Sequence, residues 1–258
     1  MIAYYPMPKF IPVSISPCQL FCKHCMGKYL KGMKKIYEGK ELIKLKKLDL
    51  NGVLISGGFD RRGRIKNLQK MLPYMRELRK KFCVALHSGF VDRKLAEMAR
   101  ESVDIVFVDL PSSNGIKNVY GLDAKPDDYF QNMEYFIDAD IMVSPHITAG
   151  LNYGNIEEWE LLDELKGYKI VKLVVDVIMP TPETPFENVS VDMEELRQFF
   201  RETRKKLKRV ALGCMRPRGR RIDEIAYEEG IKEIALPSLK LLKKIKNFEK
   251  KEVCCGCP

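Results

Sequence analysis

The stretch that decides the fold covers residues 10 to 25 and reads FIPVSISPCQLFCKHC. Its first part, Phe10 to Ser16, is a short apolar run of the kind found in buried strands. Cys18, Cys22 and Cys25 follow directly, in a C-x3-C-x2-C spacing. Three thiolates on one short loop suit three corners of a cubane iron–sulfur cluster, and the absent fourth ligand leaves one iron open to a small molecule. We therefore expect a 4Fe-4S cluster with one open corner at this loop.

Two other interpretations of this loop remain. Structural zinc normally has four closing ligands, usually supplied by two C-x2-4-C pairs. His24, beside Cys25, is poorly spaced to serve as a fourth ligand to the same ion. A plain electron-transfer cluster is the other alternative, and the motif spacing favours neither of the two.

Outward from this loop, short β-rich runs alternate with longer amphipathic stretches along the chain, which is the pattern of βα units around a parallel sheet. About eight such units are present, the number that closes a barrel. We predict an α/β fold, a (βα)8 TIM-type barrel that is complete or nearly complete, with the cluster loop after the first strand. The expected strands are Phe10–Ser16, Gly52–Ser56, Phe82–His87, Val103–Asp109, Ile141–His146, Lys169–Met179, Val210–Cys214 and Ile231–Leu236.

Stretches with helical periodicity lie between these strands, and no low-complexity linker interrupts the alternation. Asp192 followed by Glu195 resembles a capping box before an amphipathic run that starts at Met193. Gly230 is placed to end another helix. Residues 1–238 are therefore expected to form the barrel. Residues 239–258 are expected to form a C-terminal helix, near Leu239 to Phe248, and a Cys-rich tail that packs on the same domain.

Alternation along the strands predicts which side chains point into the barrel. Phe82, Val84 and Leu86 are apolar and should meet the helices, which turns the intervening residues inward. The polar residues predicted to face the interior are His87, Asp109, Ser144, His146, Lys172 and Asp176. Barrel sites gather at the carboxyl ends of strands, so His87, Asp109, His146 and Cys214 should share one rim. A turn residue for Asp109 and a hydrogen-bonded core group for each His are the plain alternatives.

Length and composition bound the remaining possibilities. The 258 residues are 45% apolar and 31% charged, which is enough for a packed core. No apolar run approaches the ~18 residues of a membrane-spanning helix, and Met1 to Phe10 lacks the pattern of a signal peptide. We expect a cytoplasmic protein without a membrane partner. Eight cysteines in such a protein indicate metal binding or catalysis rather than disulfides.

The basic net charge is weaker evidence about partners. The chain has 45 Lys and Arg against 35 Asp and Glu, a net charge of +10. Runs such as Arg204 to Arg209 alternate with apolar residues at helical spacing, which indicates solvated helix faces. An acidic protein partner is the next interpretation, and nucleic acid is not expected.

The cysteine loop resembles the signature of the radical S-adenosylmethionine (SAM) superfamily. In that family SAM chelates the open iron, and the reduced cluster splits SAM into methionine and a 5'-deoxyadenosyl radical that removes hydrogen from an unactivated carbon. The resemblance implies that Cys18, Cys22 and Cys25 are the catalytic cluster ligands, with His24 as the planar ring usual before the last Cys. The residues expected to contact the cofactor are His24, Ser56, Gly57, Gly58, His87, Asp109, Ser144 and His146. Gly57-Gly58 falls where the family has Gly-Gly-Glu, and Phe59 replaces the Glu.

Later segments are similar to biotin synthase and its relatives, among them the archaeal two-component lipoyl synthase subunits. His146 to Leu151 resembles the nucleoside-contacting segment of that group. Val177 to Pro185 resembles its Pro-rich turn, with Glu183 in place of Gly, and Leu212 to Gly219 is also similar. The resemblance extends over nearly the whole chain.

A second set of cysteines suggests an auxiliary 4Fe-4S cluster. Its candidate ligands are Cys214, Cys254, Cys255 and Cys257, because an exposed, oxidisable Cys-Cys-Gly-Cys end would be costly to keep. A flexible tail that exchanges disulfides or delivers sulfur, or a disordered end, is the alternative. Cys83 is interpreted as a plain buried residue. The arginines beside Cys214 are candidates to bind a carboxylate or to steer an acidic carrier protein, and they are Arg216, Arg218, Arg220 and Arg221. The plain alternative is that these arginines cover the start of a helix.

The resemblance implies a radical SAM enzyme that inserts sulfur into an aliphatic chain, as lipoyl synthases do. An alternative keeps the radical chemistry for rearrangement or dehydrogenation of a small metabolite, with the second cluster transferring electrons. A non-catalytic zinc or iron–sulfur protein that binds RNA is an alternative of another class. The implied partners are SAM, an electron donor such as ferredoxin or flavodoxin, an acidic carrier-protein substrate and a second radical SAM subunit.

Overall fold

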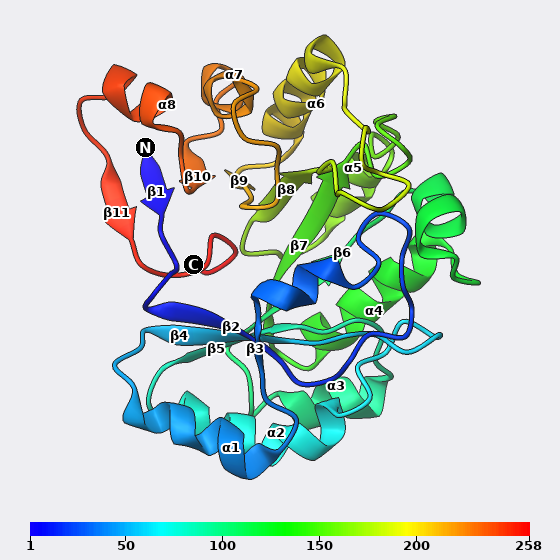
Figure 1. The fold of residues 1–258 in the computed structure, drawn as a ribbon, viewed down its shortest axis with the longest axis vertical. Helices are drawn as coiled ribbons and strands as arrows, with labels where there is room; N and C mark the ends of the chain where they lie inside the picture. The colour runs from blue at the N-terminus through cyan, green and yellow to red at the C-terminus, as the bar shows by residue number, and fades with distance from the viewer.

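Eleven parallel strands form one curled sheet in the computed structural model, which describes residues 1–258 (Figure 1). The order of the strands is β11-β1-β10-β9-β8-β7-β6-β5-β4-β2-β3. Their bounds are β1 Ile2–Tyr4, β2 Phe10–Ser14, β3 Lys34–Lys35, β4 Gly52–Ser56, β5 Cys83–His87, β6 Ile105–Asp109, β7 Met142–Ala149, β8 Leu173–Val177, β9 Val210–Leu212, β10 Glu233–Ala235 and β11 Glu249–Lys251.

All eight predicted strands are present, as β2 and β4 to β10. Their ends differ from the prediction in two clear cases. The run Lys169–Met179 contributes only Leu173–Val177, whereas β7 continues three residues beyond His146. This extension of β7 is stabilised by pairing with β8, in which Thr148 lies opposite Asp176. Strand length therefore follows the neighbouring strand as well as the local sequence.

The sheet is curled but is not closed, which corrects the expectation of a complete (βα)8 barrel. The free edge of β10 pairs with β1, where Ile2 lies opposite Glu233, and β11 pairs with the other edge of β1. The free edge of β2 pairs with β3, where Val13 lies opposite Lys34. Since both edges are occupied, β2 and β10 do not meet. The three added strands have two or three residues each, too few to show alternation in the sequence.

Helices cover the outer face of the curled sheet (Figure 1). The α-helices are α1 Gly39–Ile43, α2 Leu68–Arg79, α3 Arg93–Ala99, α4 Pro126–Asp138, α5 Leu161–Glu164, α6 Met193–Lys206, α7 Ile222–Glu228 and α8 Leu239–Lys244. Shorter helical turns are η1 Lys28–Gly32, η2 Lys44–Lys47, η3 Gly115–Tyr120 and η4 Leu165–Gly167. None of these helices combines the length and the apolar character needed to cross a membrane.

Two helix predictions have different outcomes. Helix α6 begins where predicted, because the Asp192 carboxylate accepts hydrogen bonds from the N–H groups of Glu194 and Glu195. The helix predicted up to Phe248 is wrong in its last part. Helix α8 ends at Lys244, and the chain then forms β11, because β1 offers a free strand edge that no sequence pattern reveals.

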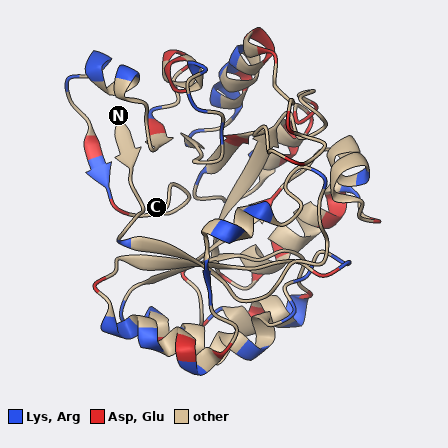
Figure 2. Ribbon diagram, viewed as in Figure 1, with Lys and Arg blue, Asp and Glu red and all other residues tan.

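The helix faces carry mixed charge (Figure 2). On α6, Arg197 and Arg201 each donate to Glu229, at 2.8 Å and 2.9 Å. Exposed pairs of this kind contribute little stability, about 0.2–1 kcal/mol each. They show that part of the basic charge is matched locally on the outer helices, as the interpretation of these runs as solvated faces predicts.

The core has an outer and an inner part. A cluster of 57 buried residues lies mainly between the sheet and the helices, and it includes Val84 and Leu86. Two smaller clusters include Ala85, with Cys83 packed nearby, and Val174. The inward and outward faces predicted for Phe82–His87 are therefore confirmed. The smaller clusters lie on the concave face of the sheet and include residues of the C-terminal tail.

The tail enters the interior at the open side of the sheet, close to the C label in Figure 1. Asn51 donates to the carbonyl of Glu252 at 3.1 Å, and the Ser144 hydroxyl donates to the carbonyl of Gly256 at 2.7 Å. Gly256 lies against the ring of Phe107, where a Cβ would approach to 2.5 Å. The tail therefore fills the space that a closed barrel would fill with strand side chains.

Arg216 does not bind an external carboxylate, which corrects the sequence interpretation. It is 1% exposed, and its Nε donates to Asp223 Oδ1 at 2.6 Å. Its other nitrogens donate to the carbonyls of Gly213 and Ala235. Arg216 thus joins three segments of the chain around β9, α7 and β10, and its charge is already paired. Arg218 donates to the carbonyls of Leu236 and Cys214.

Glu158 joins the loops that follow β6 and β7. Its carboxylate is fully buried and accepts hydrogen bonds from the N–H groups of Gly150 and Glu157 and from the Ser112 hydroxyl. Burial nevertheless raises the pKa of Glu158 from 4.5 to about 7. The folded protein binds this proton more tightly than the unfolded chain does. Stability should therefore fall as the pH rises from about 4.5 to about 7.

We expect Glu158→Gln to remove this pH dependence. The amide keeps an acceptor for the two backbone N–H groups and can donate to Ser112, without carrying a buried charge. At pH 8 the variant should be more stable than the wild type by up to roughly 3 kcal/mol, while at pH 5 the two should be similar. Thermal unfolding at both pH values measures this, with the exposed Glu160→Gln as control. Equal stability loss at both pH values would contradict it.

Candidate functional site

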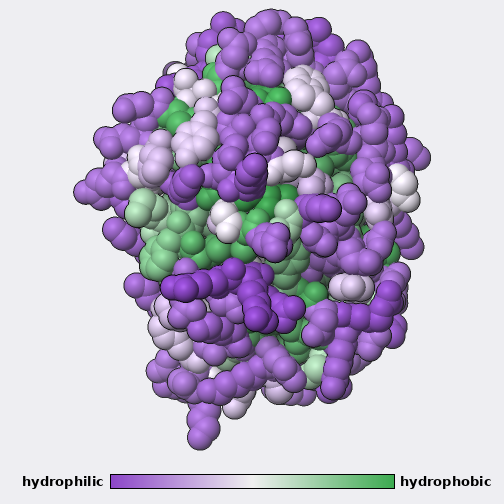
Figure 3. Space-filling view, turned by 90° about the vertical axis from the view of Figure 1, so that its right-hand side faces the viewer, coloured by the Kyte–Doolittle hydropathy of each residue, from purple (hydrophilic) through white to green (hydrophobic).

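A cavity of about 490 Å³ opens at the carboxyl ends of the strands. It is lined mostly by apolar residues, and Figure 3 faces the side on which the loops after β4, β6 and β7 gather, with apolar surface exposed between hydrophilic regions. The chemically distinctive lining residues are Cys18, Cys22, His24, Cys25, Ser56, Gly57, Gly58, His87, Asp109, His146, Asp176, Cys214, Cys254 and Cys255. Residues from both ends of the sequence thus border one space.

Backbone contacts with the β4 loop fix the cysteine loop. The carbonyl of Phe59 accepts hydrogen bonds from the N–H groups of Gln19 and Leu20, at 2.8 Å and 3.0 Å. Gly58 is packed so closely that a Cβ on it would lie 1.9 Å from the Cys18 nitrogen. The N–H groups of Cys25 and Met26 both bond to the carbonyl of Cys22. The glycine pair is therefore required for the cysteine loop to lie against β4.

The three thiols border the same cavity and affect one another electrostatically. Burial raises the pKa of Cys22, and neighbouring Cys25 and Cys18 raise it further. Burial also raises the pKa of Cys25, to about 11. A set of this kind is stable in the thiolate form only with a cationic group among the sulfurs. No three His, Cys, Asp or Glu side chains surround a single point as ligands of one ion would. Cysteine thiolates are the ligands that iron–sulfur clusters use, so the chemistry of this donor set fits such a group.

His24 lies in a cage of aromatic rings. Its ring centroid is 5.5 Å from that of Tyr29, 5.6 Å from that of Tyr120 and 6.2 Å from that of Phe186. Burial lowers the pKa of His24 to about 4, so the ring is neutral near pH 7. Its Nδ1 is buried without a hydrogen-bond partner. An unpartnered polar atom in the cavity wall is costly unless a bound group satisfies it.

His87, Asp109 and His146 lie together at the ends of neighbouring strands. His87 Nε2 is 3.0 Å from Asp109 Oδ1, and the rings of His87 and His146 are 6.2 Å apart. Burial lowers the pKa of His87, but Asp109 outweighs it, so the pKa lies above its ordinary value. Burial lowers the pKa of His146 to about 4. The group therefore contains a hydrogen-bonded pair of His87 and Asp109, in which the carboxylate favours the protonated imidazole, and one neutral imidazole.

Three of the other predicted cofactor contacts have partners within the protein. Ser56 Oγ lies 3.4 Å from His87 Nδ1 at the cavity wall. Ser144 is fully buried, bonds to the tail at Gly256, and does not line the cavity. The carbonyl of Gly58 accepts from the Ser16 hydroxyl at 2.7 Å. Ser144 thus positions the tail in this structure.

The second set of cysteines is divided. Cys214, Cys254 and Cys255 line the cavity, and the thiols of Cys254 and Cys255 are within hydrogen-bonding reach of each other. Cys257 lies deeper, among Phe10, Ala85 and Phe107, and its thiol contacts that of Cys83. All eight cysteines are free thiols. The structure brings the tail cysteines close to Cys214 and also brings in Cys83, which the sequence interpretation had set aside.

The Pro-rich segment after β8 contacts the cysteine loop across the mouth of the cavity. Lys28 Nζ donates to Glu183 Oε2 at 2.6 Å, and the hydroxyls of Tyr29 and Thr181 lie 3.2 Å apart. Glu183 has a φ of 56°, a left-handed conformation that favours glycine. This is the position at which the resembling family has Gly. The two segments are therefore joined directly although about 150 residues separate them.

Several lining residues were not assigned from the sequence. Asp176 was predicted to point inward by strand alternation but was given no role, and its carboxylate reaches the cavity. Tyr120 and Tyr129 come from η3 and α4, and Met215 from the loop after β9. Alternation could have identified Asp176 as a site residue. No sequence signal marks the other three, because helix packing and loop course bring them to the cavity.

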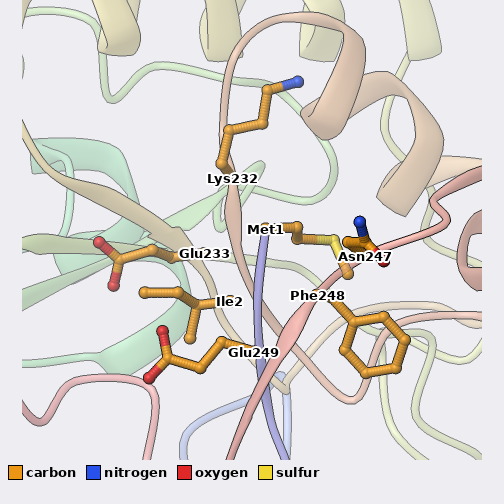
Figure 4. Close-up of a pocket in the computed structure, with 7 residues that line it drawn as sticks. All are labelled: Met1, Ile2, Lys232, Glu233, Asn247, Phe248 and Glu249. Atoms are coloured by element: carbon orange, nitrogen blue, oxygen red, sulfur yellow. The ribbon is translucent and has the colours of Figure 1, made fainter.

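A second hollow, of about 600 Å³, lies at the sheet edge beside β1, β10 and β11 (Figure 4). Glu233 lines this hollow and is partly buried. Its carboxylate accepts hydrogen bonds from Lys172 at 2.7 Å, Tyr4 at 2.6 Å and Arg209 at 3.1 Å. Burial raises the pKa of Glu233, but these donors outweigh it and lower the pKa to about 2. The partly buried carboxylate of this hollow is therefore fully matched by its own donors.

No protein-family model and no curated protein sequence matches the chain. Solved structures do resemble it. Methylornithine synthase (PylB) is 14% identical with a TM-score of 0.62, covering 88% of this chain and 70% of that chain. Streptococcus suis SuiB bound to S-adenosylmethionine is 15% identical with a TM-score of 0.60, covering 95% and 58%. The enzyme anSMEcpe with bound AdoMet is 13% identical with a TM-score of 0.52, covering 80% and 60%. These identities show a shared fold, and the chain spans less than two thirds of SuiB and of anSMEcpe.

Proposed function

We propose that this chain is a radical SAM enzyme. The observation that carries the proposal is that Cys18, Cys22 and Cys25 border the same cavity as Gly57 and Gly58. Two structures with the same fold, SuiB and anSMEcpe, contain S-adenosylmethionine. The absence of a fourth protein ligand supports an open iron rather than a saturated metal site. A cluster at these thiolates, with SAM bound, would supply a 5'-deoxyadenosyl radical.

The residues of the chain have separate roles in this proposal. The three cysteines hold the cluster, and the aromatic cage of His24 orders the loop beside it. The ring of His146 and the His87–Asp109 pair offer a neutral and a charged hydrogen-bonding group to the cofactor. The apolar wall and the contact of Lys28 with Glu183 limit the access of water. An external electron donor, ferredoxin or flavodoxin, supplies the electron.

Sulfur insertion into an aliphatic chain is the second candidate, with an auxiliary cluster held by Cys214, Cys254, Cys255 and Cys257. Its support is that three of these cysteines line the cavity beside the proposed radical site. Rearrangement or dehydrogenation of a small metabolite needs only the first cluster. An acidic carrier protein and a second radical SAM subunit belong to the sulfur-insertion alternative.

One experiment tests both levels of the proposal. The protein is reconstituted anaerobically with iron and sulfide, reduced, and incubated with SAM, and iron content and 5'-deoxyadenosine are measured. Formation of 5'-deoxyadenosine supports radical SAM chemistry, and its absence in protein with a reduced cluster would contradict it. About eight irons per chain are expected if the auxiliary cluster is present, and about four if it is not. Four irons in protein that splits SAM would remove the sulfur-insertion candidate.

A further inference from the structure

The cavity contains no lysine or arginine, although the chain has a net charge of +10. Its only carboxylates belong to Asp109 and Asp176, on β6 and β8. A cavity built for a free carboxylate or a phosphate normally offers Arg, Lys or a helix N-terminus to the anion. Since Asp109 is paired with His87, Asp176 is the acidic group of the cavity that has no basic side chain bonded to it. It favours a ligand with positive charge.

The two carboxylates differ in how their charge is matched. Asp109 is paired with His87 at 3.0 Å. Asp176 has no such partner: Oδ1 accepts the N–H of Met215 at 3.0 Å, and no side-chain cation donates to either oxygen. The nearby guanidinium of Arg216 is already bonded to Asp223 and to two backbone carbonyls. Asp176 thus presents a buried carboxylate to the cavity without a counter-ion.

The two carboxylates are close enough to act on each other electrostatically, but they have different neighbours. Asp109 is close enough to Cys22 of the cluster loop to act on it electrostatically. Asp176 acts on Cys214 and Cys254, on the side formed by the β9 loop and the tail. Gly213 makes room for this arrangement, because a Cβ there would lie 2.0 Å from Asp176 Oδ1. The unpaired carboxylate is therefore the one beside Cys214 and the tail.

We propose that Asp176 is a specificity-determining residue that binds a cationic amine on the substrate of this enzyme. The inference rests on the proposed radical SAM function and adds the class of substrate. The remaining wall is mostly apolar, so the preferred substrate is a small molecule with an ammonium group and an aliphatic part. A substrate whose only charge is a carboxylate or phosphate lacks a counter-charge in the cavity. This favours the small-metabolite alternative over an acidic carrier protein.

The test uses reconstituted holoprotein saturated with SAM, so that the ammonium group of SAM does not compete. Calorimetric titration compares n-pentylamine, 1-pentanol and pentanoate, which share one chain length and differ in charge. We expect the amine to bind at least about tenfold more tightly than the alcohol, and pentanoate to bind least. Asp176→Asn keeps the acceptor for the Met215 N–H and should remove the difference between amine and alcohol. The exposed Asp123→Asn is the matched control and should retain it.

The outcomes separate this inference from the proposed function. Wild-type protein that splits SAM but binds the amine no better than the alcohol overturns the substrate inference alone. Protein that does not split SAM removes the proposed function, whatever the probe affinities are. An amine preference that survives in Asp176→Asn also overturns the assignment to this residue. Circular dichroism and iron content of the variant check that the fold and the cluster are retained.

Discussion

Replacing Cys18, Cys22 and Cys25 together by Ala is expected to abolish 5'-deoxyadenosine formation. The other cysteines that line the cavity, Cys214, Cys254 and Cys255, come from the loop after β9 and from the tail, and Cys83 and Cys257 do not line it. The reduced variant should also lose the electron paramagnetic resonance signal of the N-terminal cluster. The rate of 5'-deoxyadenosine formation should fall to the background of the assay, because the proposed radical has no second source in this chain.

Cys83→Ala is the matched control. Cys83 lies at the start of β5 and contacts Cys257 rather than the cysteine loop. This variant should keep the N-terminal cluster and SAM cleavage. If SAM cleavage persisted in the triple variant, the cluster loop would be assigned wrongly, and the other thiols would become the candidates for the catalytic cluster.

Arg216→Ala is expected to be the most destabilising single substitution considered for this protein. It removes a fully buried guanidinium and leaves the Asp223 carboxylate and the carbonyls of Gly213 and Ala235 without their donor. Breaking a buried ion pair from one side costs about 3–5 kcal/mol. A loss of that size should lower the Tm by roughly 10 °C. Thermal and urea unfolding measure it.

Arg218→Ala tests the specificity of this effect. Arg218 is two residues away and also donates to backbone carbonyls, but it is more exposed and has no carboxylate partner. We expect it to cost less than about 1 kcal/mol. A similar loss in both variants would show that the loop after β9, rather than the buried pair of Arg216 and Asp223, determines stability in this region.

The sequence predicts a strand well where residues that face the helices alternate with residues that face the interior. In β5, Val84 and Leu86 face the helices while Ala85 and His87 face inward, so alternation is visible in five residues. Strand β11 has no such signal, since Glu249, Lys250 and Lys251 are all polar. It forms because the edge of β1 offers backbone hydrogen bonds, and β1 is available only after pairing with β10. Contacts of this kind depend on the folded sheet.

The same limit applies to the candidate site. The C-x3-C-x2-C spacing and the glycine pair are both local features of the sequence, whereas the close approach of Gly58 to Cys18 is seen only in the folded chain. The placement of the tail cysteines is not local. They reach the cavity because the sheet stays open, with β11 and β3 as its edge strands, and the hydrogen bonds of Asn51 and Ser144 hold the tail inside.

The sequence by itself therefore determined the βα alternation, the inward faces of the main strands and the three-cysteine loop, because each depends on residues close together in the chain. Only the tertiary structure decided that the barrel stays open, that Arg216 is structural and that Asp176 remains without a counter-ion. These features depend on which groups, far apart in the sequence, lie close together in the folded protein. Burial makes an unpaired charge in the interior costly. The spacing of residues along the chain does not show which of these distant groups come into contact.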